Sequence, residues 1–323
     1  MTSTQPPERG SRVAPAVRGA DGHVAPARQP GLIAQLRHRA SGNVDGPVFI
    51  VGAGRSGTSA MLGAVRKTLG WTAFGEGHLY PVAVPLMLAT HNYWGDNHAV
   101  SVNPKHMLAH VERRQFEDAL LRVVRDTCIA SHGTTRFVDK TPGPGALAAL
   151  PYMQRVFPSM RVIYCQRRPI EVVRSAMRKF PDTSFDEHCR LWRNVMTRWV
   201  RVRDELSVPY VAVDQRDMRT RPDDVAARVG ELLRLRPKQV ALFSAFLRDD
   251  QPQSSGALNQ GEVSISTTGW SNERKARFFA LCKPAMDEHG WTEGPAYFAA
   301  DTTDSSLSTK SATGSSGRKA SID

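Results

Sequence analysis

Short apolar runs rich in β-branched residues alternate along the chain with longer segments whose apolar residues recur every three or four positions. The short runs predict strands, and the longer segments predict amphipathic helices. Strands that alternate with helices form a parallel sheet covered on both faces, so the pattern predicts an α/β fold. The predicted strands are 48–51, 72–74, 136–139, 161–166 and 209–213, and the predicted helices between them are 59–69, 104–130, 145–156, 169–180 and 185–206.

The pattern changes towards both ends of the chain. After residue 213 it is mostly helical, with predicted helices at 223–235, 238–247 and 272–289 and a polar loop at 251–269. Residues 1–45 are rich in Pro, Gly, Ala and Arg, and residues 301–323 are rich in Ser, Thr and Gly. Such compositions predict a disordered arm and tail. We therefore expect a single domain at 47–300, with a central parallel sheet flanked by helices and a helical C-terminal third.

Composition narrows the class of protein. A hydrophobic content of 41% supports a packed core, and the net charge of +12 favours an anionic ligand, an anionic membrane surface or nucleic acid. The four cysteines form no CxxC pair, which indicates reduced thiols rather than a disulfide framework or a zinc site. No segment is long and apolar enough for a membrane span, and the first residues lack the apolar core of a secretory signal. These features predict a cytoplasmic protein.

The sequence GAGRSGTS follows the first predicted strand and precedes a predicted helix, which is the setting of a phosphate-binding loop. Gly52, Gly57 and Ser59 fit the frame GxxxxGK[ST], but Thr58 occupies the lysine position. Without that lysine the loop is poorly suited to ATP or GTP. Backbone N–H groups and the Arg55 side chain can still hold one phosphate group. The candidate phosphate-binding residues are Gly54, Arg55, Ser56, Gly57, Thr58 and Ser59.

A second candidate phosphate site follows the strand at 161–166. That strand ends in two arginines and Pro169, which suits the first position of a helix. Arg167 at the strand exit and Ser175 on the next helix can grip one phosphate from two sides, because a guanidinium forms bidentate, charge-assisted hydrogen bonds. Together with the first loop, this pair predicts a ligand with two separated phosphate groups.

The two motifs, GAGRSGTS and R-x-P-x-E-x-x-x-S, resemble the 5′- and 3′-phosphate motifs of sulfotransferases that use 3′-phosphoadenosine-5′-phosphosulfate (PAPS). The resemblance covers about residues 47–291. DKTP at 139–142 and GEGH at 75–78 are closest to the bacterial and tyrosylprotein-type branch. The resemblance implies a P-loop-like fold and transfer of a sulfuryl group from PAPS to a hydroxyl of a small molecule, carbohydrate or lipid. It implies no metal ion and no nucleic-acid partner.

The resemblance also implies roles for individual side chains. Glu76 matches the general base of the tyrosylprotein-type enzymes, and it takes a proton best if partial burial raises its pKa. His78 is the rival base, because imidazole accepts protons near neutral pH. Lys140 matches a lysine that reaches the transferring sulfonate, and Arg55 is expected to neutralise the phosphosulfate bridge. Two further residues, Arg274 and Lys275, are expected to close over the 3′-phosphate.

Two other classes of protein stay open at this point. One is a P-loop-type kinase of small molecules, which the threonine in the lysine position of the loop and the lack of a clear Asp-bearing second motif disfavour. The other is a basic module that binds nucleic acid or other anions. That class usually interleaves clustered bases with aromatic residues, whereas aromatic residues make up only 7% of this chain. The sequence leaves the acceptor and the oligomeric state undetermined.

Overall fold

The computed structural model describes residues 44–249 and 263–294. All of these residues belong to one compact unit. The C-terminal tail predicted at 301–323, nearly all of the arm predicted at 1–45, and the end of the predicted domain at 295–300 lie outside the described residues. Most of the polar loop predicted at 251–269 lies outside them as well.

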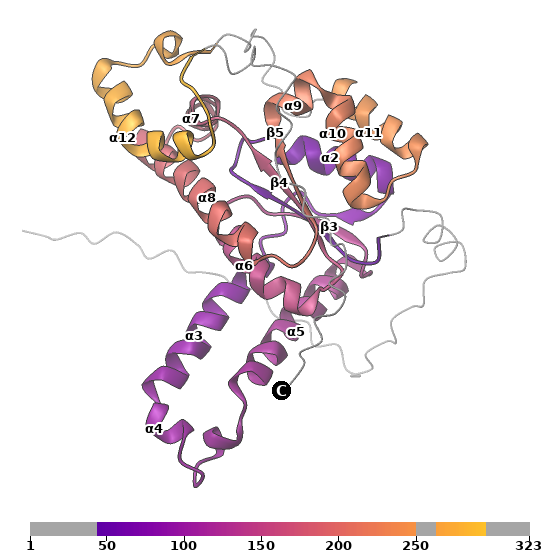
Figure 1. Cartoon of the computed structure of the whole chain (residues 1–323), viewed down its shortest axis with the longest axis vertical. Coiled ribbons are helices and arrows are strands. Elements are labelled where there is room, and N and C mark those ends of the chain that lie inside the picture. Colours follow the sequence, from indigo (N-terminus) through magenta and orange to yellow (C-terminus); the bar gives the residue numbers. More distant parts are fainter. Residues whose placement is uncertain (1–43, 250–262, 295–323) are drawn as a thin grey trace, which may run out of the picture. The chain divides into compact units, whose positions relative to one another are not determined.

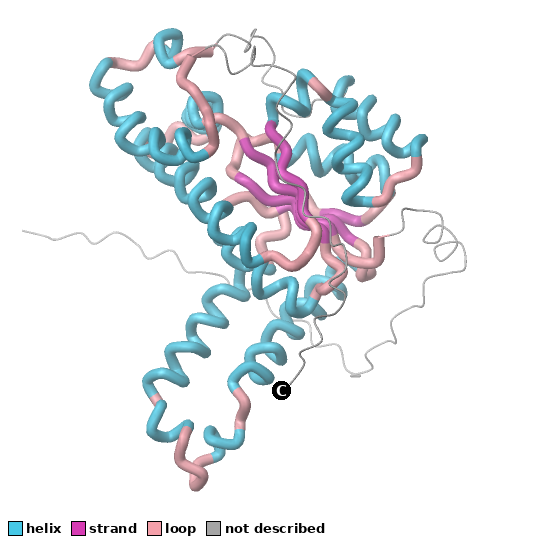
Figure 2. Tube along the Cα trace, viewed as in Figure 1, coloured by secondary structure: helices cyan, strands magenta, loops and turns pink. Residues whose placement is uncertain are grey.

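In the described part of the chain, five parallel strands form one sheet in the order β2-β3-β1-β4-β5, visible at the centre of Figure 2. The ends of the five predicted strands differ from those observed by a single residue at most. Within the sheet, Ile50 pairs with Lys140 and Gly52 pairs with Cys165. The strands are β1 (Val48–Gly52), β2 (Thr72–Ala73), β3 (Phe137–Lys140), β4 (Arg161–Gln166) and β5 (Tyr210–Asp214).

Helices cover both faces of the sheet, as the alternating pattern predicts (Figure 1). Side chains alternate along β1, so Phe49 packs in one hydrophobic core and Ile50 in the other. The core around Ile50 is covered by α2 (Thr58–Leu69), α9 (Gln215–Thr220), α10 (Pro222–Leu233) and α11 (Pro237–Asp249). The core around Phe49 is covered by α3 (Ala83–Asp96), α5 (Arg113–His132), α6 (Pro144–Val156), α7 (Pro169–Lys179), α8 (Phe185–Glu205) and α12 (Asn272–Glu288).

The structure corrects the helix predicted at 104–130. It is divided into the 3₁₀ helix η2 (Met107–His110) and α5, because Val111 and Glu112 are extended. The Glu112 carboxylate then caps α5 by accepting the Gln115 N–H at 3.0 Å, which fixes the start of the helix. Five further elements had no counterpart in the sequence prediction, namely η1 (Tyr80–Val82), α3, the short α4 (His98–Ser101), α9 and η4 (Ile265–Thr268).

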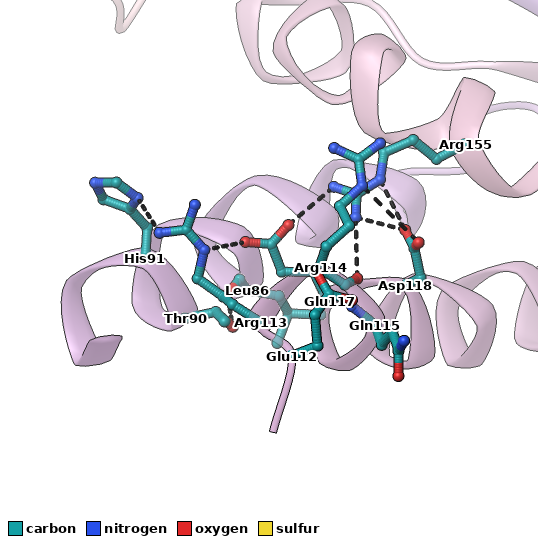
Figure 3. A network of polar contacts seen from close by, with 10 residues as sticks. All are labelled: Leu86, Thr90, His91, Glu112, Arg113, Arg114, Gln115, Glu117, Asp118 and Arg155. Atoms are coloured by element: carbon teal, nitrogen blue, oxygen red, sulfur yellow. Dashed lines mark hydrogen bonds and ion pairs between the residues drawn. The ribbon is translucent and has the colours of Figure 1, made fainter. Parts of the chain in front are cut away.

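An ion-pair network joins α5 to α6 (Figure 3). The Arg155 guanidinium of α6 lies 3.1 Å from a carboxylate oxygen of Glu117 and 2.5 Å from one of Asp118, both on α5. Arg155 and Glu117 are mostly buried, with side-chain exposures of 11% and 13%. Removing one partner of a shielded ion pair costs more stability than removing one partner of an exposed pair, because the remaining charge has lost its hydration. This network therefore joins the N-terminal part of α5 to α6, which covers the sheet.

We expect Arg155→Ala to lower the free energy of unfolding by about 1–3 kcal/mol, because two partly shielded carboxylates lose their shared partner. Chemical denaturation with a helical signal measures this change. Arg114→Ala is the matched control, since the Arg114 side chain is 63% exposed and lies 3.9 Å from Asp118. The control should lose less than about 0.5 kcal/mol. Equal losses in the two variants would contradict an anchoring role for Arg155.

Candidate active site

The candidate site lies where the strand order of the sheet reverses. From the central strand β1, the chain first builds β2 and β3 towards one edge of the sheet. It then builds β4 and β5 on the other side of β1, towards the opposite edge. Open parallel sheets bind ligands at such a point, beyond the carboxyl ends of the strands. Gly52 ends β1 beside Cys165 of β4, and a Cβ atom on Gly52 would lie 2.0 Å from the Cys165 carbonyl oxygen. The loops that follow these two strands therefore start side by side.

The loop after β1 has the backbone of an anion site. Arg55 and Gly57 have positive φ angles of 69° and 85°, and Gly57 directly precedes α2. Such turns point successive N–H groups into one concave surface, and the helix N-terminus adds to its positive potential. Ser56 is fully buried, and its hydroxyl has no hydrogen-bond partner among the described residues. Thr58 and Ser59 begin the helix, so the predicted loop residues share one turn.

The structure brings the two predicted phosphate motifs into contact. Arg55 Nε donates a hydrogen bond to Ser175 Oγ at 2.9 Å, across 120 residues of sequence. Arg167 Nη1 donates to the Arg55 carbonyl oxygen at 3.1 Å. The Arg167 carbonyl in turn accepts the Trp192 Nε1–H at 2.9 Å, which ties the strand exit to α8. Two guanidinium groups and a hydroxyl are thus connected by hydrogen bonds between the motifs.

The next residue, Arg168, has a different role. Its guanidinium is fully buried and lies 2.5 Å from a carboxylate oxygen of Glu171. It also donates hydrogen bonds to three carbonyl oxygens, those of Val263, Thr292 and Gly294. Arg168 and Glu171 of the R-R-P-x-E segment therefore hold the C-terminal segments in place, and the Arg168 guanidinium bonds to these groups rather than to the predicted phosphate site.

A second group of polar side chains lies at the end of β3. Glu76 Oε1 is 2.8 Å from Lys140 Nζ, and Glu76 Oε2 is 2.6 Å from His78 Nε2. Lys140 Nζ also donates to Ser59 Oγ at 3.4 Å, and its side chain is only 5% exposed. The candidate bases are therefore connected to the phosphate loop through a buried lysine. Sequence separations of 64 and 81 residues kept these contacts out of the sequence analysis.

Two opposing effects act on the pKa of the Glu76 carboxyl group. Burial raises the pKa of Glu76, but hydrogen bonds from Lys140 and His78 and the charge of Lys140 outweigh it. The net result is a pKa below the usual range of glutamate. The raised pKa that would favour Glu76 as a base is therefore not found here, because 42% of the Glu76 side chain is exposed and a lysine ammonium lies beside it.

Two residues next to Lys140 have no role in the sequence analysis. Asp139 is 4% exposed and Thr141 is 2% exposed, and the Thr141 hydroxyl donates to Asp139 Oδ1 at 2.7 Å. Burial raises the pKa of Asp139, although the hydrogen bond from Thr141 partly opposes this. An aspartate in a buried strand was the signal available in the sequence, because charged residues are rarely buried unless they have a partner.

The last predicted pair lies in the first turn of α12. Ser271 caps this helix by accepting the Arg274 N–H at 3.2 Å. The Arg274 guanidinium lies over the Phe185 ring, 5.3 Å from its centroid, and Lys275 follows on the same turn. α12 packs against α8, whose Trp192 bonds to the second phosphate motif. The predicted roles of Arg274 and Lys275 at a 3′-phosphate stay predictions.

No group of three or more His, Cys, Asp and Glu side chains among the described residues has an arrangement that could hold a metal ion. Within the same residues, no helix combines the length and apolar character needed to cross a membrane.

The chain belongs to the sulfotransferase family. The family model described as "Sulfotransferase family" matches residues 47–238, which include both phosphate motifs and the Glu76–Lys140 pair. Nothing in this match supports the kinase alternative. A comparison with curated proteins found no match.

Several solved structures resemble the chain. Sulfotransferase STF9 from Mycobacterium avium is 16% identical with a TM-score of 0.41, over 78% of this chain and 79% of that one. The sulfotransferase domain from the curacin biosynthetic pathway is 14% identical with a TM-score of 0.41, over 77% of this chain and 99% of that one. The sulfotransferase domain of the Synechococcus PCC 7002 olefin synthase is 16% identical with a TM-score of 0.39, over 82% of this chain and 91% of that one.

Proposed function

We propose that this sulfotransferase moves the sulfuryl group of PAPS to a hydroxyl group of a small-molecule, carbohydrate or lipid acceptor. The observation that carries the proposal is the contact between the two phosphate motifs, in which Arg55 bonds to Ser175 and Arg167 bonds to the Arg55 backbone. A ligand with two separated phosphates, as in PAPS, matches two guanidinium groups connected in this way. ATP, with its phosphates in one chain, calls for the lysine and magnesium that a P-loop kinase uses.

The residues present fit the nucleotide. The buried Ser56 hydroxyl has no hydrogen-bond partner among the described residues, and the N–H groups at the start of α2 follow a turn with the positive φ angles of a phosphate-binding loop. Gly57, Thr58 and Ser59 are the residues that would hold the 5′-phosphate. Arg167 and Ser175 would hold the 3′-phosphate through charge-assisted hydrogen bonds. When bound, PAPS supplies the sulfuryl group and a phosphate leaving group.

In the proposed mechanism, positioning and electrostatics supply most of the rate enhancement, as in phosphoryl transfer. Lys140 and Arg55 neutralise negative charge on the sulfonate and on the leaving phosphate. The Glu76 carboxylate takes the proton of the acceptor hydroxyl. At the same time the oxygen of that hydroxyl bonds to sulfur, and the bond between sulfur and the phosphate oxygen breaks. The expected carboxylate base and the expected lysine are already 2.8 Å apart.

The pair of Glu76 and Lys140 also gives the base a means of activation. Lys140 lowers the pKa of Glu76 while the two groups are paired. If Lys140 turns towards the sulfonate, Glu76 loses this partner and its pKa rises, which makes it a better proton acceptor. The same change leaves His78 as the remaining neighbour of Glu76, at 2.6 Å.

We place the protein in the cytoplasm. The supporting observation is that Cys128, Cys165, Cys189 and Cys282 are all free and buried. Unpaired thiols are typical of a reducing compartment.

We expect 3′,5′-diphosphoadenosine to bind more tightly than ATP, and we expect its affinity to be the same with and without EDTA. The reason is that the site offers cationic and hydroxyl groups for a 3′-phosphate and lacks the P-loop lysine. Calorimetry with both nucleotides measures the two affinities. Tighter binding of ATP that depends on magnesium would overturn the proposed use of PAPS.

The transfer itself is tested by incubating the full chain with labelled PAPS and a panel of hydroxyl-bearing extracts. Mass spectrometry should then detect acceptors that have gained a sulfonate group. The full chain without PAPS and the Glu76→Gln variant with PAPS are the controls. A panel of small molecules, carbohydrates and lipids in which none gains a sulfonate would count against the proposed function.

A further inference from the structure

We propose that Asp139 and Thr141 are positioning residues, which hold the turn that carries Glu76 beside Lys140. The inference rests on the sulfuryl-transfer function proposed above. The Thr141 hydroxyl donates to Asp139 Oδ1 at 2.7 Å, and Thr141 Oγ1 accepts the backbone N–H of His78 at 3.1 Å. These two hydrogen bonds connect a buried carboxylate to the backbone of the turn.

The turn itself lies directly on the Asp139 carboxylate. Gly77 N–H donates to the Lys140 carbonyl oxygen at 3.2 Å. A Cβ atom on Gly77 would lie 1.9 Å from Asp139 Oδ2, so only glycine allows this approach. His78 has a φ of 53°, in the left-handed region that is uncommon for residues other than glycine. Such a conformation persists where surrounding contacts enforce it, and the bond to Thr141 is such a contact.

Asp139 and Thr141 are both joined to the neighbouring strand β1. Asp139 lies in β3 opposite Phe49 of β1, and Thr141 N–H donates to the Ile50 carbonyl oxygen at 3.2 Å. An ionised carboxylate only accepts hydrogen bonds, so the Thr141 hydroxyl has to donate to it. The hydroxyl oxygen then keeps its lone pairs for the His78 N–H. The Asp139 carboxylate thus fixes the direction in which the Thr141 hydroxyl donates. The oxygen of that hydroxyl in turn fixes the position of the His78 N–H in the turn.

Neither residue needs to touch a substrate in this role. Glu76 is the group assigned to the acceptor proton, and its distance from Lys140 depends on where the turn places it. A buried carboxylate is unfavourable unless hydrogen bonds compensate for its lost hydration. Asp139 receives such a bond from Thr141. Through this bond and the one from Thr141 to the turn, the buried carboxylate fixes the position of Glu76 beside Lys140.

The test begins with Thr141→Val, which keeps the shape of the side chain and removes its hydroxyl. We expect turnover with PAPS to fall about ten-fold, the effect of one hydrogen bond on a rate, with unchanged affinity for 3′,5′-diphosphoadenosine. Thr141→Ser should restore most of the turnover. Thr68→Val is the matched control, since Thr68 is also buried but lies ten residues beyond the start of α2. It should leave turnover unchanged.

A double variant separates positioning from a general structural effect. If Thr141 acts through Glu76, then Thr141→Val lowers turnover no further in a Glu76→Gln background. Losses that multiply in the double variant would overturn the inference.

Hydrogen exchange of the peptide that covers 75–78 gives a readout that does not depend on turnover. It should speed up in Thr141→Val and stay unchanged in Thr68→Val. A wild-type protein that transfers no sulfuryl group would overturn the proposed function alone, and the exchange rates would still decide whether Thr141 holds the turn. Unchanged exchange in Thr141→Val overturns the inference.

Discussion

Glu76→Gln should lower the turnover of the purified enzyme by about 10²–10⁴-fold, the range expected when a general base is lost. The amide keeps the size and shape of the carboxylate but cannot accept the proton of the acceptor hydroxyl. Nucleotide affinity should change little, because Glu76 contacts Lys140 and His78 rather than the phosphate loop. Steady-state kinetics with PAPS and an identified acceptor measure the loss, and calorimetry measures the affinity.

His78→Ala is the control for this prediction. The His78 side chain is 61% exposed and contacts the far oxygen of the Glu76 carboxylate, so we expect a much smaller loss of turnover. Because both residues share one turn, melting temperature and nucleotide affinity should be measured for each variant. A folded His78→Ala enzyme without activity, together with a nearly normal Glu76→Gln enzyme, would transfer the role of base to His78.

The pH dependence provides an independent check on Glu76. Its pKa is below the usual glutamate range in the free enzyme, so the active carboxylate persists as the pH falls through that range. We therefore expect kcat/KM to decline only at more acidic pH, since this parameter reports the free enzyme. If Lys140 leaves Glu76 when the donor binds, the acidic limb of kcat should lie at higher pH. An acidic limb of kcat/KM at about pH 6.5 would indicate that a histidine is the general base instead.

Arg167→Ala should weaken the binding of 3′,5′-diphosphoadenosine by about 1.5–3 kcal/mol, the scale of a charge-assisted hydrogen bond. The loss should be much smaller for adenosine 5′-phosphosulfate, which lacks the 3′-phosphate. A small loss is expected even for that ligand, because Arg167 also donates to the Arg55 carbonyl oxygen and so supports the loop. Calorimetry with both ligands separates the two contributions.

Arg178→Ala is the matched control, because Arg178 is exposed near the end of α7, the helix that begins two residues after Arg167. It should leave both affinities unchanged. If Arg167→Ala weakened the two ligands equally, Arg167 would support the loop without contacting a 3′-phosphate. Calorimetry of Ser175→Ala would then show whether Ser175 alone holds that group.

The sequence was sufficient for the parts of this protein that depend on local patterns. The strands of the sheet follow from short β-branched runs, and α2 and α7 follow from a glycine loop and from Pro169 at a helix start. Where local signals were weak, the predicted helices differ from the observed ones. The extended residues Val111 and Glu112 divide one predicted helix, and α3 begins beside prolines that obscure its periodicity.

The arrangement of the site depended on the tertiary structure, because its contacts join residues that are far apart in the chain. The sequence identified Arg55, Ser175, Glu76 and Lys140 as separate candidates, but only the packing of β1 between β3 and β4 brings them into two connected groups. The pKa of Glu76 shows the physical reason. Its direction depends on the distance to a charge 64 residues away in sequence, and that distance is a property of the folded sheet.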